Sequence, residues 1–407
     1  MARRHAVVKY YLDLPCIAEV PCAYRHDSAG LMEQSGANLG NFAFRHALRF
    51  LVADFDSYLP ERYIAYHSAA GRGQVTRALV SCANWLGTSA QDEAANRNRA
   101  RAFAATDTPT VCFGLGVQAR ADDVPDLGPE TRRLARVLAE RAPLLSVRDE
   151  LTRRTLEGIG ITNAVVTGCP SNFINPDPDL GARVRARALR TPGDGEDIWR
   201  QMRSLLCEAS GGHAASQQVL ADMLRLMARS PAFLVLQSPQ LLAFLLRETE
   251  ALPPSYLAAN PFAPDEDRLR QLLRTHTLHF SSVEGWMDFS RTCDIAFGMR
   301  IHGTMLALQA GVPALLVSHD ARTAGLGTHM GIPQIPAEGF AECARAGPGA
   351  LFAVVAEAMA GYDARRAALA RVMCDYLQAN GLVPHAAVAA LAGRPPPHGP
   401  SPAQVVP

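Results

Sequence analysis

The segment Asp294–Thr304 reads Asp-Ile-Ala-Phe-Gly-Met-Arg-Ile-His-Gly-Thr, and it decides the fold class. A short apolar run predicts a buried strand, and the turn after it carries Arg300 and His302. A helix is expected to begin near Gly303 or Thr304, whose hydroxyl is suited to cap it. Strand, turn and helix in this order form the basic unit of a parallel α/β sheet. Both polar side chains should lie at the carboxyl edge of that sheet, where such folds bind ligands.

The same alternation of apolar runs and helical stretches extends along the chain. The expected strands are Tyr63–Tyr66, Thr110–Phe113, Leu144–Val147, Ala164–Val166, Phe233–Gln237, Leu278–Ser281, Asp294–Met299 and Ala314–Ser318. The expected helices include Phe42–Val52, Pro129–Glu140 and Glu150–Glu157. This pattern predicts an α/β protein with two doubly wound, Rossmann-like domains that face a cleft.

Changes in composition suggest where the domains end. We expect an N-terminal domain over residues 1–176, a helical connection over 177–230 and a C-terminal domain over 231–393. Residues 394–407 are rich in proline and are expected to be disordered.

Composition excludes several classes of protein. With 407 residues, of which 48% are hydrophobic and 19% charged, the chain is long and apolar enough for two globular domains. Lys plus Arg number 40 against 39 for Asp plus Glu, so no excess of positive charge indicates a nucleic-acid partner. Apolar runs such as Ala232–Leu236 and Pro313–Val317 are far shorter than a transmembrane segment.

Two further patterns favour a cytoplasmic protein. The N-terminal residues mix charged and apolar side chains, so no signal-peptide core is present and secretion is not expected. Nine cysteines without a Cys-x-x-Cys pair fit reduced, mostly buried thiols better than disulfides or a zinc site.

Arg300 and His302 together predict an anion site with a proton donor. Arginine offers a bidentate fork to a phosphate or carboxylate, a helix N-terminus adds partial positive charge, and histidine moves protons near neutral pH. Arg148 and Asp149 follow the first-half strand Leu144–Val147 in the same way. The alternatives stay open: either arginine can pair with a structural carboxylate, and Asp149 is suited to cap the next helix.

Four loops carry weaker signals. Gly114-Leu-Gly116 with Gln118 lacks the third glycine of a dinucleotide motif, and Gly168-Cys-Pro-Ser171 follows the next strand. Asn38-Leu-Gly40-Asn41 resembles a tight turn into a helix, with asparagines that either cap the backbone or touch a ligand. Asp320 and Arg322 follow the last clear strand, either as a surface ion pair or as part of the cleft.

These motifs, in this order, resemble the polysaccharide pyruvyl transferase family. The segments that carry the resemblance are Asn38–Asn41, Gly114–Gly116, Ser146–Asp149, Gly168–Ser171, Gly298–Gly303 and Ala310–Asp320, within roughly Gly36 to Pro333. Many family members carry lysine after the late aspartate, whereas this chain has Arg322 two residues beyond Asp320. Arginine keeps the charge but changes the geometry.

The resemblance implies a glycosyltransferase-B-like fold and transfer of a pyruvyl group from phosphoenolpyruvate to a sugar of a polysaccharide or glycan precursor, as in exopolysaccharide synthesis. The product would be a pyruvate ketal, with phosphate released. The family's Arg-x-His pair falls on Arg300 and His302, and its first-domain arginine falls on Arg148; we expect these three in catalysis. The expected binding residues are Asn38, Gly40, Asn41, Gly116, Gln118, Gly168, Ser171, Gly303, Thr304, Asp320 and Arg322. No cofactor or metal is expected.

Two alternatives remain. One is a sugar-nucleotide glycosyltransferase of the same architecture, although Leu306 stands where many such enzymes carry a carboxylate for the ribose. The other is a non-catalytic glycan- or anion-binding relative, against which the joint presence of Arg148, Arg300 and His302 argues. The sequence leaves open the oligomeric state, the acceptor sugar, whether that sugar is lipid-linked, and whether His302 is the general acid or a phosphate ligand. A cytoplasmic location with transient contact at the membrane surface would fit an enzyme that acts before export.

Overall fold

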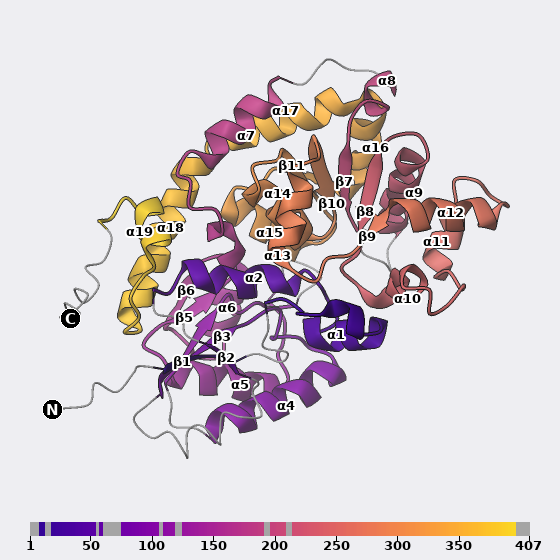
Figure 1. The fold of residues 1–407 in the computed structure, drawn as a ribbon. Helices are drawn as coiled ribbons and strands as arrows, with labels where there is room; N and C mark the ends of the chain where they lie inside the picture. The colour runs from indigo at the N-terminus through magenta and orange to yellow at the C-terminus, as the bar shows by residue number, and fades with distance from the viewer. Residues whose placement is uncertain are drawn as a thin grey trace, which may run out of the picture.

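A computed structural model describes residues 8–12, 18–53, 57–59, 75–105, 109–118, 124–190, 196–208 and 214–395. Parallel strands form one sheet in the first half of the chain and another in the second (Figure 1). Helices alternate with the strands, so the predicted α/β class is confirmed. Two Rossmann-like halves of this kind are the glycosyltransferase-B-like arrangement expected from the sequence.

The first sheet has the strand order β2-β1-β3-β4, and neighbouring strands are parallel. The four strands are β1 (Val8–Leu12), β2 (Ser57–Leu59), β3 (Val75–Ser81) and β4 (Thr110–Phe113). Two further parallel strands, β5 (Leu145–Val147) and β6 (Ala164–Val166), lie beside β4. Leu115, just beyond β4, forms a parallel bridge with Val147 and thereby joins the two sets.

The second sheet has the order β12-β11-β10-β7-β8-β9, and all of its strand pairs are parallel. Its strands are β7 (Ser204–Cys207), β8 (Ala232–Val235), β9 (Thr277–Leu278), β10 (Ile295–Gly298), β11 (Ala314–Ser318) and β12 (Gln334–Pro336). The central strands β7 and β10 are buried along their whole length, as expected for a sheet covered on both faces.

The α-helices of the described residues are α1 (Ser28–Ser35), α2 (Asn41–Ala47), α4 (Ala90–Ala104), α5 (Pro129–Glu140), α6 (Glu150–Glu157), α7 (Leu180–Ala188), α8 (Glu196–Trp199), α9 (Ala214–Met227), α10 (Leu242–Leu245), α11 (Pro254–Ala258), α12 (Glu266–His276), α13 (Val283–Ser290), α14 (Ile301–Gln309), α15 (Ala321–Met330), α16 (Ala337–Ala346), α17 (Pro348–Met359), α18 (Tyr362–Ala379) and α19 (Ala386–Leu391). In Figure 1, α2 lies between the two sheets, and α18 runs from the second half back to the first.

Polar contacts along α2 and α18 tie the two halves together. The Leu39 amide, just before α2, donates to the Gln237 carbonyl over 2.8 Å. On α18, Arg366 Nε donates to the Asn172 carbonyl over 2.9 Å, and the Tyr376 hydroxyl donates to the Cys112 carbonyl at the end of β4. The space between the sheets is therefore enclosed by elements that belong to both.

Most sequence-predicted elements are present. The strands Thr110–Phe113, Ala164–Val166 and Ala314–Ser318 and the helices Pro129–Glu140 and Glu150–Glu157 have the predicted bounds, and Asp149 caps α6 as expected. The cysteines of the described residues are free thiols, and all except Cys22 and Cys343 are buried. The predicted strand Tyr63–Tyr66 and nearly all of the tail 394–407 lie outside the described residues.

Some predicted elements need correction. The expected helix Phe42–Val52 is α-helical only over Asn41–Ala47 and continues as a single 3-10 turn over Leu48–Phe50. The stretch 177–230 is not only a helical connection, because β7 within it is a central strand of the second sheet. Strand β9 ends at Leu278 and not at Ser281, because the following residues pair with another segment: Ser281 accepts from the Val20 amide, and Ser282 bridges Glu19.

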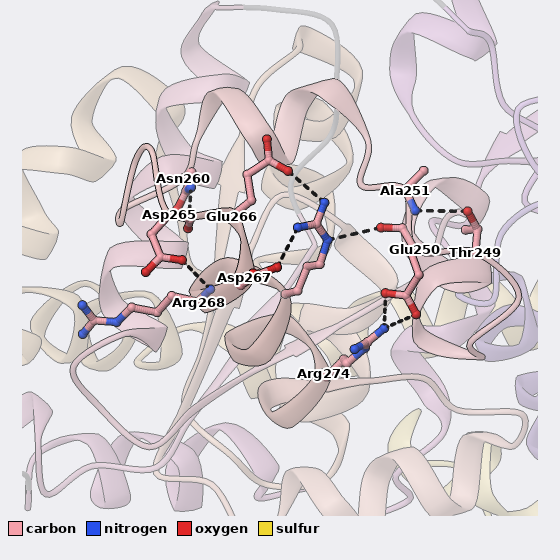
Figure 2. A network of polar contacts seen from close by, with 10 residues as sticks. Thr249, Glu250, Ala251, Asn260, Asp265, Glu266, Asp267, Arg268 and Arg274 are labelled. Carbon is pink, nitrogen blue, oxygen red and sulfur yellow. Dashed lines mark hydrogen bonds and ion pairs between the residues drawn. The ribbon is translucent and has the colours of Figure 1, made fainter.

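A network of polar contacts lies around α12 in the second half of the chain (Figure 2). Asp265 caps the helix by accepting from the Arg268 amide over 2.9 Å, and Arg274 pairs with Glu250 at 2.6 Å. Glu250 and its neighbours are solvent-exposed, and exposed ion pairs typically contribute about 1 kcal/mol or less each. This network supports a peripheral helix and lines none of the cavity described below.

Gly298 allows β10 to approach β7 closely. Its φ is 156°, and a methyl group at this position would overlap the Cys207 carbonyl on β7. Gly298→Ala should therefore lower the free energy of unfolding by about 3 kcal/mol or more. Gly361→Ala is the control, since a methyl group there meets no atom within 4 Å. Urea denaturation of both variants measures the effect, and equal stability of the two would contradict this account.

Candidate functional site

A cavity of about 110 Å³ is lined by loops that follow strands of both sheets. The first half of the chain contributes Asn38, Asn41, Ala83, Asn84, Arg148 and Asp149, and the second half contributes Gln237, Met299, Arg300, Ile301, His302, His319, Arg322, Thr323 and Leu326. Arg148 follows β5, Arg300 follows β10 and His319 follows β11. The cavity therefore lies at the carboxyl ends of the parallel strands, where this fold class binds ligands.

Arg148 is almost completely buried, with 4% of its surface exposed. Its Nη1 donates to Asn84 Oδ1 over 3.2 Å, and its guanidinium carbon lies 5.4 Å from the centre of the Phe44 ring. Gly116 leaves room for the side chain, since a methyl group there would come within 3.1 Å of Arg148 Cδ. Burial lowers the pKa of Arg148, yet a guanidinium group stays charged at neutral pH.

Asp149 is engaged with α6. Its Oδ1 accepts from both the amide and the hydroxyl of Thr152, each over 2.7 Å. The carboxylate thus satisfies the first turn of α6, and the described residues show no ion pair that ties up Arg148. Arg148 keeps its charge for the cavity.

Arg300 is the N-cap residue of α14, with extended backbone between strand and helix. Helix α14 begins at Ile301, two residues earlier than expected, and Thr304 does not cap it. The Thr304 hydroxyl instead donates to the Arg300 carbonyl over 3.5 Å inside the first turn. Arg300 and the first residues of the helix, Ile301 and His302, all line the cavity, so the guanidinium and the helix N-terminus both favour an anion there.

Arg322 brings a third guanidinium group to the cavity. Its Nη2 lies 3.3 Å from Asp320 Oδ2, while Asp320 Oδ1 caps α15 by accepting from the Thr323 amide over 2.6 Å. Burial alone would raise the pKa of Asp320, but Arg322 and the Thr323 hydrogen bonds outweigh burial, and the pKa lies below its usual value. Asp320 is thus an ionised carboxylate that orients Arg322.

His302 stands among the three guanidinium groups and is only 7% exposed. Burial, and then the positive charges of Arg148, Arg322 and Arg300, lower the pKa of His302 to about 3. Its Nε2 lies 3.7 Å from Cys169 Sγ, and its ring centre is 5.2 Å from that of Phe44. In the cavity as it stands, His302 is a neutral imidazole at physiological pH.

The structure brings six of the sequence-predicted site residues to the cavity: Asn38, Asn41, Arg148, Arg300, His302 and Arg322. Gly40 and Gly303 lie directly beside it, because a methyl group on either would collide with the cavity residue Gln237. Three others act through a cavity residue or element: Asp320 orients Arg322, Thr304 hydrogen-bonds within the first turn of α14, and Gly116 leaves space for Arg148.

Three predicted residues do not line the cavity. Ser171 is buried behind His302, where its hydroxyl lies 3.1 Å from Cys169 Sγ. Gly168, with φ 75°, forms the turn before that cysteine and packs near Met330. Gln118 is exposed. Their motifs support the site from outside and do not form its wall.

Sequence reasoning missed Asn84 and Gln237 and gave His319 no role, although all three line the cavity. Each follows a strand end, after β3, β8 and β11 respectively, so the rule that located the arginines applies to them too. Gln237 was hidden because the predicted strand Phe233–Gln237 included it, whereas β8 ends at Val235.

Three cavity residues carry buried nitrogen atoms that find no acceptor within the described ranges: Arg148 Nε, Arg300 Nε and Gln237 Nε2. All three are hydrogen-bond donors. A buried donor without an acceptor is costly, so a ligand that supplies acceptor oxygens would satisfy what the protein leaves open.

A family model described as polysaccharide pyruvyl transferase matches residues 38–321, most of the chain. The chain belongs to this family. The match begins at the Asn38 turn, includes Arg148, Arg300 and His302, and ends one residue before Arg322. The resemblance carried by the sequence motifs is thereby confirmed, and a pyruvyl transferase with a glycan acceptor is what membership supports.

Similar solved structures share little sequence with this pyruvyl transferase family member. One described as a UDP-N-acetylglucosamine 2-epimerase from Listeria monocytogenes is 15% identical, with a TM-score of 0.40 and 78% of each chain covered. A trehalose 6-phosphate synthase from Burkholderia multivorans is 15% identical, with a TM-score of 0.42 over 82% of this chain and 75% of that one. A glycotransferase of kitacinnamycin is 12% identical, with a TM-score of 0.31 over 95% and 98%. No curated protein matches the chain.

The described residues hold neither a candidate metal site nor a candidate membrane span. They contain no group of three or more His, Cys, Asp or Glu side chains placed to hold a metal ion. None of the helices described for this pyruvyl transferase family member is long and apolar enough to cross a membrane.

The low pKa of His302 makes stability depend on pH. The unfolded chain takes up a proton near pH 6.5 and the folded chain near pH 3, so stability falls as the pH drops below about 6.5. At about pH 5.5 this histidine should cost the ligand-free protein about 1.3 kcal/mol relative to neutral pH. In His302→Gln, this part of the fall in the free energy of unfolding with decreasing pH should disappear, as measured by urea denaturation. An unchanged fall would contradict the neutral state of His302.

Proposed function

We propose that this protein transfers a pyruvyl group from phosphoenolpyruvate to a sugar of a polysaccharide or glycan precursor, forming a ketal and releasing phosphate. The observation that carries the proposal is the set of three guanidinium groups, Arg148, Arg300 and Arg322, around one small cavity beside His302. Phosphoenolpyruvate has a phosphate and a carboxylate on a three-carbon frame, so it needs cationic groups at two places close together. An enzyme acting before export would work in the cytoplasm, with transient contact at the membrane surface.

Binding of phosphoenolpyruvate would raise the pKa of His302, so that the imidazole takes up a proton from solvent. The empty cavity holds the pKa of His302 at about 3, through burial and through repulsion from the arginines. Anionic groups of phosphoenolpyruvate would offset the arginine charges, remove that repulsion and raise the pKa of His302. The imidazole would then carry a proton next to the enol.

The reaction would proceed by protonation and two additions. His302 gives its proton to the methylene carbon, which becomes a methyl group, and positive charge develops at the carbon that bears the phosphate oxygen. A sugar hydroxyl attacks this carbon, the bond to the phosphate oxygen breaks, and a second hydroxyl closes the ketal. Of the two hydroxyl protons, one returns to His302 and the other leaves with phosphate. Arg148 and Arg300 would offset negative charge on the departing phosphate.

The two alternatives are less well supported. The cavity of about 110 Å³ is by itself below the roughly 300 to 1,000 Å³ typical of sites for larger ligands, so a nucleotide sugar would have to extend into the neighbouring hollow that shares Asp149 and Arg322 with it. Leu306, at the position where a ribose-binding carboxylate would stand, is fully buried in the core. A non-catalytic anion-binding relative would need the arginines, but it has no need of a histidine enclosed by them.

Binding of phosphoenolpyruvate tests the donor without knowledge of the acceptor. At about 100 times its dissociation constant, the ligand should add about 2.7 kcal/mol to the stability of the wild-type protein. Arg148→Ala and Arg300→Ala each remove charge-assisted hydrogen bonds, so each should weaken binding by about 2 to 4 kcal/mol, roughly 30- to 1,000-fold in Kd. Calorimetry and thermal shift measure both effects.

Arg371→Ala is the matched control, because Arg371 is exposed on α18, away from the cavity. Its affinity for phosphoenolpyruvate should equal that of the wild type. A folded wild-type protein that binds nucleotide sugars and not phosphoenolpyruvate would overturn the proposed donor.

Donor binding should be accompanied by proton uptake at His302. If the pKa of His302 rises from about 3 on binding, the complex holds more protons than the free protein at any pH between the two values. Calorimetry near neutral pH, in buffers of different ionisation enthalpy, should show a larger uptake for the wild type than for His302→Gln. The proton uptake of the variant is subtracted from that of the wild type, which removes the protons taken up by the phosphate of phosphoenolpyruvate itself. Equal uptake by both proteins would show that His302 stays neutral in the complex.

A further inference from the structure

Gln237 is a cavity residue whose side chain has no evident structural task. It lies just beyond β8, is 1% exposed, and lines the cavity with Arg300 and His302. Its Nε2 has no hydrogen-bond partner in the part of the chain that the structure describes. Burying an amide N–H without an acceptor is unfavourable, so a glutamine kept here needs another reason.

The backbone of Gln237 is held firmly in place by Glu208, a buried carboxylate at the end of β7. Glu208 Oε2 accepts from the amides of Gln237 and Ser238 over 2.8 and 2.9 Å, and Oε1 accepts from the Ser238 hydroxyl over 2.6 Å. On the other side, the Gln237 carbonyl accepts from the Leu39 amide over 2.8 Å. The unpartnered amide therefore extends from a fixed backbone.

Glycines from both halves of the chain leave the space that the Gln237 side chain fills. A methyl group at Gly40 would overlap Gln237 Oε1, and one at Gly303 would lie 2.8 Å from Nε2. Gly303 belongs to the first turn of α14, so the amide lies beside the helix N-terminus and the residues Arg300 and His302.

The unsatisfied groups of the cavity share one chemistry. Gln237 Nε2, Arg148 Nε and Arg300 Nε are all N–H donors, and a single ligand with several acceptor oxygens and no donors would satisfy all three. Ionised phosphoenolpyruvate is such a ligand. A sugar hydroxyl fits these groups less well, because it would add its own O–H hydrogen-bond donor to a cavity that already has more N–H donors than acceptors.

We propose that the side-chain amide of Gln237 donates a hydrogen bond to an anionic oxygen of bound phosphoenolpyruvate. Gln237 is then one of the residues that bind the pyruvyl-group donor, an inference that rests on the proposed function. Glu208 and the two glycines explain how the amide is placed. The amide adds a neutral donor at a point where a fourth cation would increase the repulsion on His302.

Two variants test the proposal by calorimetry with phosphoenolpyruvate. Gln237→Met keeps the length of the side chain and removes its hydrogen bond, which should weaken binding about 10- to 100-fold. Gln237→Glu keeps the shape but places a carboxylate against an anion, so it should weaken binding further. Gln218→Glu makes the same chemical change on the exposed face of α9, where Gln218 contacts only Asp222 in the described residues, and should bind like the wild type.

Thermal unfolding without ligand checks that each variant folds, and either folded variant suffices for the test. Binding by both Gln237 variants at wild-type affinity would overturn the role of Gln237 and leave the proposed function intact. Failure of the wild type itself to bind phosphoenolpyruvate would overturn both proposals. A loss confined to the Gln237 variants, with Gln218→Glu unaffected, is the expected result.

Discussion

The gathering of three guanidinium groups, one buried and two partly buried, around one cavity is the constraint on which the rest of the site depends. Arg148, Arg300 and Arg322 surround a cavity of about 110 Å³, and like charges in a buried setting repel more strongly than in water. The fold partly offsets this repulsion, because Asp320 pairs with Arg322 and the buried Glu208 carboxyl interacts electrostatically with Arg300. Asp320 orients Arg322, an amide oxygen and an aromatic face hold Arg148, and the Asp149 carboxylate is engaged with α6. What remains is a positive cavity whose unused N–H groups require a ligand rich in acceptor oxygens.

Such a cavity exists only if both halves of the chain hold their places. Arg148 comes from the first sheet and the other two arginines from the second, so their spacing is set by contacts between the halves. The Leu39 amide bound to the Gln237 carbonyl, and α18 bound through Tyr376 to the end of β4, supply those contacts. Close approach at the cavity in turn requires glycine at positions 40, 116 and 303, where a side chain would push cavity residues aside. Several short motifs of the sequence are therefore steric requirements of one site.

How far the sequence predicts the site follows from the same physics. Arg148, Arg300 and His302 could be located because strand ends in parallel sheets converge at one edge, and each stands directly after a clear apolar strand. The strand β7, Ser204–Cys207, was missed because it has only four residues and follows a helical stretch. Gln237 was missed because the predicted strand ran through it, whereas β8 ends at Val235, and because the space for its side chain is left by Gly40 and Gly303, which are distant in sequence. The neutral state of His302 could not be predicted at all, since it depends first on the burial of the side chain and then on how close three separate arginines come.

The charge of the cavity also couples donor binding to proton transfer. A histidine whose pKa is about 3 cannot act as an acid at neutral pH, and the arginines that lower its pKa are the groups an anionic donor would contact. An anion that occupies them removes part of the repulsion, so protonation of His302 and occupancy of the cavity favour each other, as linkage requires. Were the arginines fewer, His302 would hold its proton more readily but the donor would bind less tightly. A neutral amide at Gln237 suits this balance, because it adds a hydrogen bond to the donor without adding a charge that lowers the pKa of His302 still further.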